Sequence, residues 1–142
     1  MDETKSNTAS RGSFLTVMAV LFVVLALSNF TKAIQYQHDP AVGGLVVFGY
    51  KIQGVGANAI AGPLFGLILL AYAYGLWKLR PWVKTLSVIY AFYVPYNLVL
   101  FWFLHTDARP SVRFIVQYLA IALIGSVGTA LYVAYHKDRF RN

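Results

Sequence analysis

Four amide side chains are the groups in this sequence best suited to act together on a ligand. Asn29, Asn58, Asn97 and Gln117 each lie in a different long apolar run, on the same side of its midpoint. A helical rise of 1.5 Å per residue places them about 6–12 Å from that midpoint. An unpaired amide in hydrocarbon costs several kcal/mol, so these groups are expected to turn inward and pair. The amides therefore predict one polar layer near one end of a helix bundle.

Aromatic residues and prolines fall at a similar depth. Tyr90, Tyr93 and Asn97 follow an i, i+3, i+7 pattern and so share one stripe of a helix. Pro63 and Pro95 each remove a helix hydrogen bond and free a carbonyl one turn earlier, and such interruptions are typical of ligand cavities in transporters. An outward-opening cleft is one interpretation, and a sealed bundle knitted by the amides is the other. The residues expected to contact a ligand in the cleft are Asn29, Asn58, Tyr90, Tyr93, Asn97 and Gln117.

Signatures of catalysis are missing from the sequence. It has no cysteine, no His-Glu-x-x-His zinc motif, no phosphate-binding glycine loop and no Gly-x-Ser-x-Gly turn. All acidic residues and histidines lie outside the apolar runs, so neither a carboxylate pair nor a haem ligand is expected at membrane depth. His38 and His105, with Asp39 and Asp107, have no diagnostic metal-ligand spacing. We expect a non-enzymatic protein without a metal or cofactor.

The elements that position these groups follow from the composition. Hydrophobic residues make up 58% of the 142 positions and charged residues 12%, about half the share of a soluble domain. The four apolar runs cover residues 14–34, 55–77, 82–104 and 113–135. Each has about 20 residues, enough for a helix to cross the roughly 30 Å hydrocarbon layer. The sequence therefore predicts an all-α fold, a single-domain four-helix bundle in a membrane.

Basic residues set the expected orientation. Eight of the twelve lie in the arm 1–13, the turn after residue 77, the start of the third run, and the tail 136–142. The excess of positive charge on that side places both termini in the cytoplasm. The side chains expected to meet anionic lipid headgroups are Lys78, Arg80, Lys84, Lys137, Arg139 and Arg141. This clustering between apolar runs favours lipid over nucleic acid as the partner of the +7 net charge. Lys32, near the other end of the first run, can reach the interface by extending its stem.

The first run has a second interpretation. Arg11, the apolar stretch from Phe14 to Leu25 and then Ala26-Leu27-Ser28 imitate a secretory signal and its cleavage site. Cleavage would leave three helices in the same orientation. The apolar character continues to Ile34, which favours a retained helix.

The connection at residues 35–54 is long for a loop between packed helices. It begins polar, becomes apolar from Leu45 to Phe48 and is punctuated by glycines, which suits a flap or short hairpin over the bundle mouth. Small residues form two ridges, where helix backbones are expected to approach closely. The ridges contain Gly62 and Gly66 on the second run and Ala122, Ser126 and Ala130 on the fourth. They suit packing within one bundle or against a second copy or a larger membrane complex.

The segment Gly75-Leu76-Trp77-Lys78-Leu79-Arg80-Pro81-Trp82 resembles the turn between the middle helices of small uncharacterised four-helix bacterial inner-membrane proteins. The resemblance covers that turn and the four-helix layout, implies a bacterial inner membrane and implies no activity. Two functions are consistent with these observations. The first is a non-enzymatic accessory subunit or self-associating bundle. The alternative is a binder or carrier of a small apolar or lipid-like ligand in the outward-facing cleft.

Overall fold

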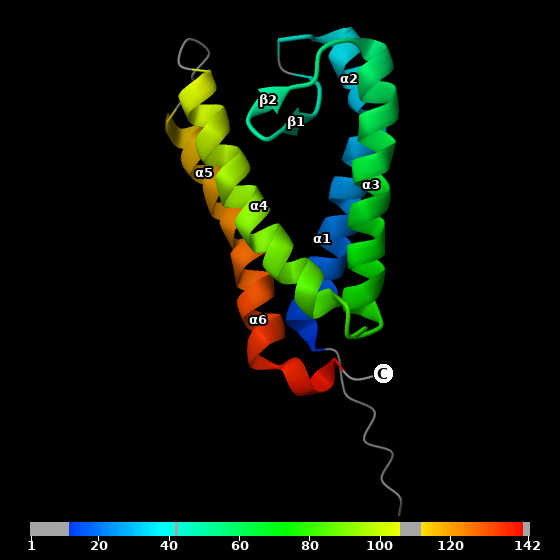
Figure 1. The fold of residues 1–142 in the computed structure, drawn as a ribbon, viewed down its shortest axis with the longest axis vertical. Coiled ribbons are helices and arrows are strands. Elements are labelled where there is room, and N and C mark those ends of the chain that lie inside the picture. Colours follow the sequence, from blue (N-terminus) through cyan, green and yellow to red (C-terminus); the bar gives the residue numbers. More distant parts are fainter. Residues whose placement is uncertain (1–11, 42, 106–111, 141–142) are drawn as a thin grey trace, which may run out of the picture.

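The computed structural model describes residues 12–41, 43–105 and 112–140, and helices dominate it (Figure 1). The prediction of an all-α fold is confirmed at this level. In chain order the elements are α1 (Ser13–Phe30), α2 (Lys32–His38), β1 (Val46–Val47), β2 (Tyr50–Lys51), α3 (Val55–Trp77), α4 (Val83–Leu104), α5 (Val112–Leu123), the π-helical segment η1 (Ile124–Gly128), α6 (Thr129–Tyr135) and the 3₁₀ turn η2 (Lys137–Arg139). Helices α1, α3 and α4 are long and apolar enough to cross a membrane, and the apolar stretch Leu119–Tyr135 is shorter.

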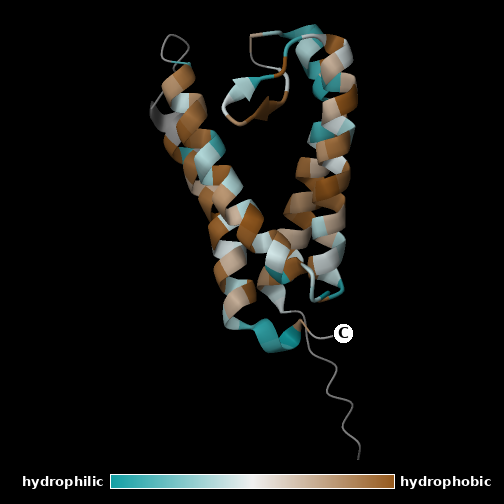
Figure 2. Cartoon of the chain, viewed as in Figure 1, coloured by the Kyte–Doolittle hydropathy of each residue, from teal (hydrophilic) through white to brown (hydrophobic). Residues whose placement is uncertain are grey.

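The helices form two arms of a V. The first arm is α1 with α2 packed along α3, and the second arm is α4 packed along α5, η1 and α6 (Figure 1). The arms meet at the narrow end of the V, which also holds the turn between α3 and α4 and the last described residues of the chain. At the wide end, the antiparallel hairpin β1–β2 lies between the arms. Hydrophilic residues concentrate around the hairpin and the tail, and hydrophobic residues cover the helices between them (Figure 2).

The hydrophobic core fills the narrow end. Its fully buried members come from both arms, so the two arms are joined there by apolar packing rather than by the turn alone. They include Leu15 and Phe22 of α1, Leu76 of α3, Val83 of α4, Val133 of α6 and Phe140. Each is at most 1% exposed.

The small residues of α3 explain how the first arm is held together. A Cβ on Gly62 would collide with the backbone oxygen of Asn29, and one on Gly66 would lie 3.1 Å from that of Ala26. The glycine ridge thus brings the backbones of α1 and α3 into close contact, as small residues do between membrane helices. On the second arm, Ser126 and Ala130 are buried and the η1 and α6 segments pack against α4.

The turn between α3 and α4 ends its helix with a paired backbone motif. The Arg80 amide donates to the Gly75 carbonyl at 2.9 Å, and the Leu79 amide donates to the Leu76 carbonyl at 3.4 Å. This is the Schellman pattern, which needs a left-handed residue after the helix. Leu79 takes that place with a φ of 52°, although glycine usually does, and its side chain is buried in the core. Packing of the leucine side chain therefore offsets the backbone strain.

Two expected helices differ in detail from the structure. The run predicted as one helix over 14–34 is divided at Thr31, which separates α1 from α2, and α2 continues to His38, into the segment expected to be loop. The Thr31 hydroxyl and the side-chain amide of Gln35 both donate to the Ser28 carbonyl. These side-chain bonds replace regular helical pairing. The fourth run, expected over 113–135, is one helical stretch interrupted by η1, where Gly125, Ser126 and Gly128 weaken the regular helix. The arm 1–11, Asp107 and Arg141 lie outside the described residues.

Candidate functional site

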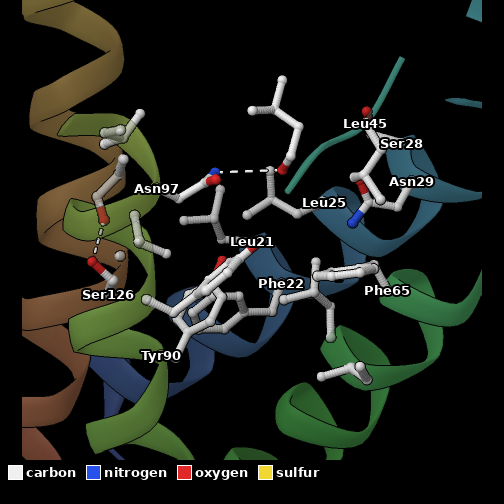
Figure 3. Close-up of a pocket in the computed structure, with 18 of the residues that line it drawn as sticks. Leu21, Phe22, Leu25, Ser28, Asn29, Leu45, Phe65, Tyr90, Asn97 and Ser126 are labelled. Carbon is white, nitrogen blue, oxygen red and sulfur yellow. Dashed lines mark hydrogen bonds between the residues drawn. The ribbon is translucent and has the colours of Figure 1, made fainter. Parts of the chain in front are cut away.

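A cavity of about 470 Å³ lies between the two arms, beneath the hairpin. Its walls come from α1, α3, α4 and the segment from α5 into η1 (Figure 3). The volume lies within the range of about 300–1,000 Å³ that small-molecule sites occupy. Most of the lining is apolar, with aliphatic side chains from every wall, and several of its polar groups lie near the hairpin. The polar lining there includes Ser28, Asn29, Lys32 and Asn97.

The cavity is open along one side. Leu25, Ile68, Ile89 and Ile121 all line it, and each of these side chains remains at least 37% exposed. They come from α1, α3, α4 and α5, so the opening runs between the two arms.

Asn58 ties the hairpin loop to the first arm. Its side-chain oxygen accepts a hydrogen bond from the Leu45 amide at 2.8 Å. Its side-chain nitrogen donates to the carbonyls of Ile52 and Gly54, both at 2.9 Å. The side chain is fully buried, and both its oxygen and its nitrogen are paired with backbone groups of the loop. Asn58 therefore clamps both ends of the loop onto the start of α3.

Asn97 ties the same hairpin to the second arm. Its side-chain oxygen accepts a hydrogen bond from the Gly49 amide at 2.8 Å, and its nitrogen donates to the Val46 carbonyl at 3.4 Å. The ring of Phe48 packs edge-on against Tyr93, with centroids 5.5 Å apart. The hairpin is thus fixed to both arms and covers the wide end of the cavity.

The tip of the hairpin explains why a glycine stands at position 49. Phe48 and Gly49 have φ values of 49° and 78°, the positive pair typical of a tight two-residue hairpin turn. A Cβ on Gly49 would lie 2.5 Å from the Cβ of Leu100, so α4 comes too close for any side chain there. Phe48 carries the strain of a left-handed non-glycine residue, and its contact with Tyr93 offsets part of it.

Aromatic rings close the floor of the cavity. The rings of Phe22, Tyr72 and Tyr90 meet from α1, α3 and α4, with centroids 4.6 to 5.6 Å apart. Such offset and edge-on pairs add roughly 0.5–1.5 kcal/mol each beyond their burial. The three rings therefore hold the arms together just where the cavity ends.

The structure brings together some of the six residues expected in the cleft and separates others. Asn29, Tyr90, Tyr93 and Asn97 line the cavity. Asn58 is not part of the lining, and its side-chain amide is hydrogen-bonded to the backbone of the loop. Gln117 is exposed on α5 and is not part of the lining. The amides do not pair with one another; instead two of them hold the hairpin. Asn29 points toward the cavity (Figure 3), and its side chain has no hydrogen-bond partner within the described part of the chain.

Sequence reasoning missed Lys32 and Ser126 as parts of the cavity wall. Lys32 is the first residue of α2, directly after the break at Thr31, and it lines the cavity. Ser126 lies in η1, where its hydroxyl donates to the Ala122 carbonyl at 2.7 Å. Segments of π-helix are rare and frequently stand at functional sites. The close spacing of Gly125, Ser126 and Gly128 was the signal that could have indicated the irregular helix.

The other predicted residues lie at the narrow end or along the second arm. Ala122 lines the cavity, and Ser126 and Ala130 are buried in the second arm. Of the basic residues, Lys78, Arg80 and Lys137 are exposed, and Lys84 and Arg139 are half-buried.

The residues that the structure describes contain no cluster of three or more potential metal ligands. Their polar groups at the cavity are amides, hydroxyls and one ammonium, which can bind and orient a molecule by hydrogen bonds and charge. Comparison of the chain with known protein families, characterised proteins and solved structures finds no match.

Proposed function

We propose that this chain is a non-enzymatic integral membrane protein that binds a small apolar or lipid-like ligand in the cleft between its arms. The observation that carries the proposal is the apolar cavity of about 470 Å³, open between the arms and covered at its wide end by a hairpin that Asn58 and Asn97 fix to both of them. A buried, concave, mainly apolar site with a few polar groups is the usual form of a small-molecule site.

The surface of α4 supports a membrane as the surroundings. Only 6% of its apolar span is buried, although the span has a mean hydropathy of 1.6. Phe92 and Phe103 are 75% and 72% exposed. Water would make such a continuous apolar face unfavourable, whereas lipid chains cover it at no cost.

We further propose a bacterial inner membrane with both termini in the cytoplasm. Gly12, the α3–α4 turn and the tail share the narrow end of the V, where the exposed lysines and arginines are found (Figure 1). The positive-inside bias then directs the narrow end to the cytoplasm and the hairpin outward. The test uses the absence of cysteine: Tyr50→Cys is expected to react with an impermeant maleimide added to intact cells, and Lys137→Cys only after lysis. The opposite labelling pattern contradicts this orientation.

An accessory subunit or self-associating bundle is supported less well. The small-residue ridges that suited a partner chain are used inside this one: Gly62 and Gly66 contact α1, and Ser126 and Ala130 are buried in the second arm. Recovery of a stoichiometric partner protein after gentle extraction, without bound lipid, would favour this function over ligand binding.

The binding experiment compares two neighbouring tryptophan variants. Ile68 lines the cavity, whereas the adjacent Leu67 is exposed and lies outside the lining. Saturable binding of tritiated hexadecanol or hexadecanoate to the purified protein, measured by scintillation proximity, is expected for the unaltered chain and for Leu67→Trp. Ile68→Trp fills the cavity and is expected to weaken binding at least tenfold. Absence of saturable binding of both probes, or equal effects of the two variants, would refute the proposal.

A further inference from the structure

The polar end of the cavity carries the positive charges of Lys32 and of its neighbour Lys51. Lys32 lines the cavity, and its ammonium donates to the side-chain oxygen of Gln35 at 3.0 Å. The neighbouring Lys51 ammonium donates to the carbonyls of Pro40 and Ala41 at 2.6 and 2.7 Å. All three acceptors are neutral. Within the described residues, neither lysine forms an ion pair.

The setting makes the Lys32 charge unfavourable on its own. Burial, and then the charge of Lys51, lowers the pKa of Lys32 below its usual value. The two cations repel each other at a partly desolvated site. An anion bound in the cavity beside the loop would offset both the desolvation of Lys32 and its repulsion by Lys51. Charge complementarity therefore favours a negatively charged group at this end.

Local hydrogen bonds position Lys32 and leave N–H donors of its ammonium available for a ligand. The Gln35 side-chain nitrogen donates to the Ser28 carbonyl at 3.1 Å and to the Thr31 hydroxyl at 2.8 Å, which fixes its oxygen toward Lys32. Gly62 lets the Lys32 backbone approach α3, since a Cβ on Gly62 would be 3.2 Å from the Lys32 Cβ. An ammonium has three N–H donors, and Gln35 takes one. The unpartnered amide of Asn29 lies on the same wall of the cavity.

The length of the apolar lining matches a single lipid leaflet. On α1 and α2 the lining runs from Leu21 to Lys32, which at 1.5 Å per residue is about 16 Å. Half of the hydrocarbon layer is about 15 Å thick. Leu21 lies near the middle of α1 and Lys32 lies beyond its end. The cavity thus offers an apolar slot one acyl chain long, with a cation at the end beneath the hairpin.

We propose that the cleft selects an anionic amphiphile, with its apolar chain between the arms and its carboxylate or phosphate head bound by Lys32 and Asn29. This inference rests on the proposed function and adds the charge of the ligand head. A charge-assisted hydrogen bond in a partly desolvated site is stronger than a neutral one. Ligands with the same acyl chain are therefore expected to differ in affinity according to the charge of their head group.

The experiment measures the affinity of ligands with the same sixteen-carbon chain and different heads (a chain chosen as about one leaflet long). Hexadecanoate and hexadecyl phosphate are expected to bind at least tenfold more tightly than hexadecanol, and hexadecyltrimethylammonium more weakly still. Lys32→Met is expected to abolish this difference, whereas Lys32→Arg keeps it. Lys84→Met is the matched control, because Lys84 is a half-buried lysine at the opposite end of the molecule. Thermal unfolding checks that Lys32→Met is folded, and its stability is expected to be equal or higher because two opposed cations become one.

Each outcome separates the inference from the proposed function. If hexadecanol binds as tightly as hexadecanoate and Lys32→Met changes nothing, the cleft binds ligand but the inference is wrong. If neither probe binds saturably, the proposed function itself fails. Competition by phosphatidylglycerol identifies a membrane lipid as the source of the anionic head. Competition only by single-chain anions identifies a free amphiphile, and both of these results support the selection of negative charge.

Discussion

The two asparagines that hold the hairpin differ in how deeply they are buried, and this difference predicts unequal effects on stability. Asn58→Leu keeps a side chain of similar size and removes three hydrogen bonds to the loop. The Gly54 carbonyl still accepts a hydrogen bond from the backbone N–H of residue 58 at 3.2 Å. The Leu45 amide and the Ile52 carbonyl lose the Asn58 side-chain partner. A buried polar group left unpaired costs about 1–3 kcal/mol, so the variant is expected to lose about 2–6 kcal/mol of unfolding free energy.

Asn97→Leu is expected to cost less. It removes one short bond, to the Gly49 amide, and one long bond of 3.4 Å, and the residue is only half-buried. A net contribution of about 0.5–1.5 kcal/mol for each of the two hydrogen bonds gives a loss of about 1–3 kcal/mol, with the long bond at the low end of its range. Because Asn58 still clamps the loop, this variant is expected to release the hairpin tip from α4 without unfolding the arms.

Two measurements check the pair. Equilibrium unfolding in mixed micelles gives the free energies, and a nitroxide label on Tyr50→Cys reports the mobility of the hairpin. Gln117→Leu is the matched amide control, since Gln117 is exposed and is not part of the cavity, and it is expected to change stability by less than about 0.5 kcal/mol. Equal losses for Asn58→Leu and Asn97→Leu, or an immobile label in Asn97→Leu, would refute the assignment of the two anchors.

Three further substitutions test the backbone contacts. Gly62→Ala is expected to destabilise the protein by about 1–3 kcal/mol, because its Cβ would meet the Asn29 carbonyl oxygen. The control Gly56→Ala, in the same helix with open space around it, is expected to stabilise by about 0.5–1 kcal/mol in the same unfolding titration. Gly49→Ala is expected to increase the mobility of the Tyr50→Cys label, since both its positive φ and the contact with Leu100 oppose a side chain; an unchanged spectrum contradicts this. Leu79→Gly relieves about 1–2 kcal/mol of left-handed strain but removes a buried leucine worth about 2–5 kcal/mol, so a net loss of stability is expected and a gain would overturn our account of the turn.

The helices could be predicted from the sequence because their signal is length and hydrophobicity, which need no knowledge of neighbours. The runs at 55–77 and 82–104 match α3 and α4 closely. The run at 14–34 was predicted too long, since hydropathy averages over a window and does not register that Thr31 and Gln35 bond to the Ser28 carbonyl. Such polar bonds within one turn of an apolar helix decide where it ends.

The candidate site was predicted only in part, for a geometric reason. Counting residues from the midpoint of a run gives depth, and all four amides share a similar depth. It does not give the direction in which a side chain points, and α1, α3 and α4 are apolar on every side, so they have no polar face to indicate it. Asn97 and Asn29 point toward the cavity, whereas Asn58 lies behind the loop and Gln117 lies outside the lining. The V shape was likewise beyond the sequence, because a helix surface suited to lipid resembles one suited to another helix.

The size of the cavity argues that whatever fills it contributes to the fold. The space of about 470 Å³ is open between the arms, so in a membrane it is filled by whatever surrounds the helices and is not a sealed void. Water gains few hydrogen bonds at walls of leucine, isoleucine and phenylalanine, whereas an apolar acyl chain packs against them. The aromatic floor joins the arms at one end of the cavity, and the hairpin bonded to Asn58 and Asn97 stands between them at the other. In the function proposed above, an acyl chain between Leu25 and Ile121 would complete the packing between the arms, and the charge at Lys32 would select the head group that this acyl chain carries.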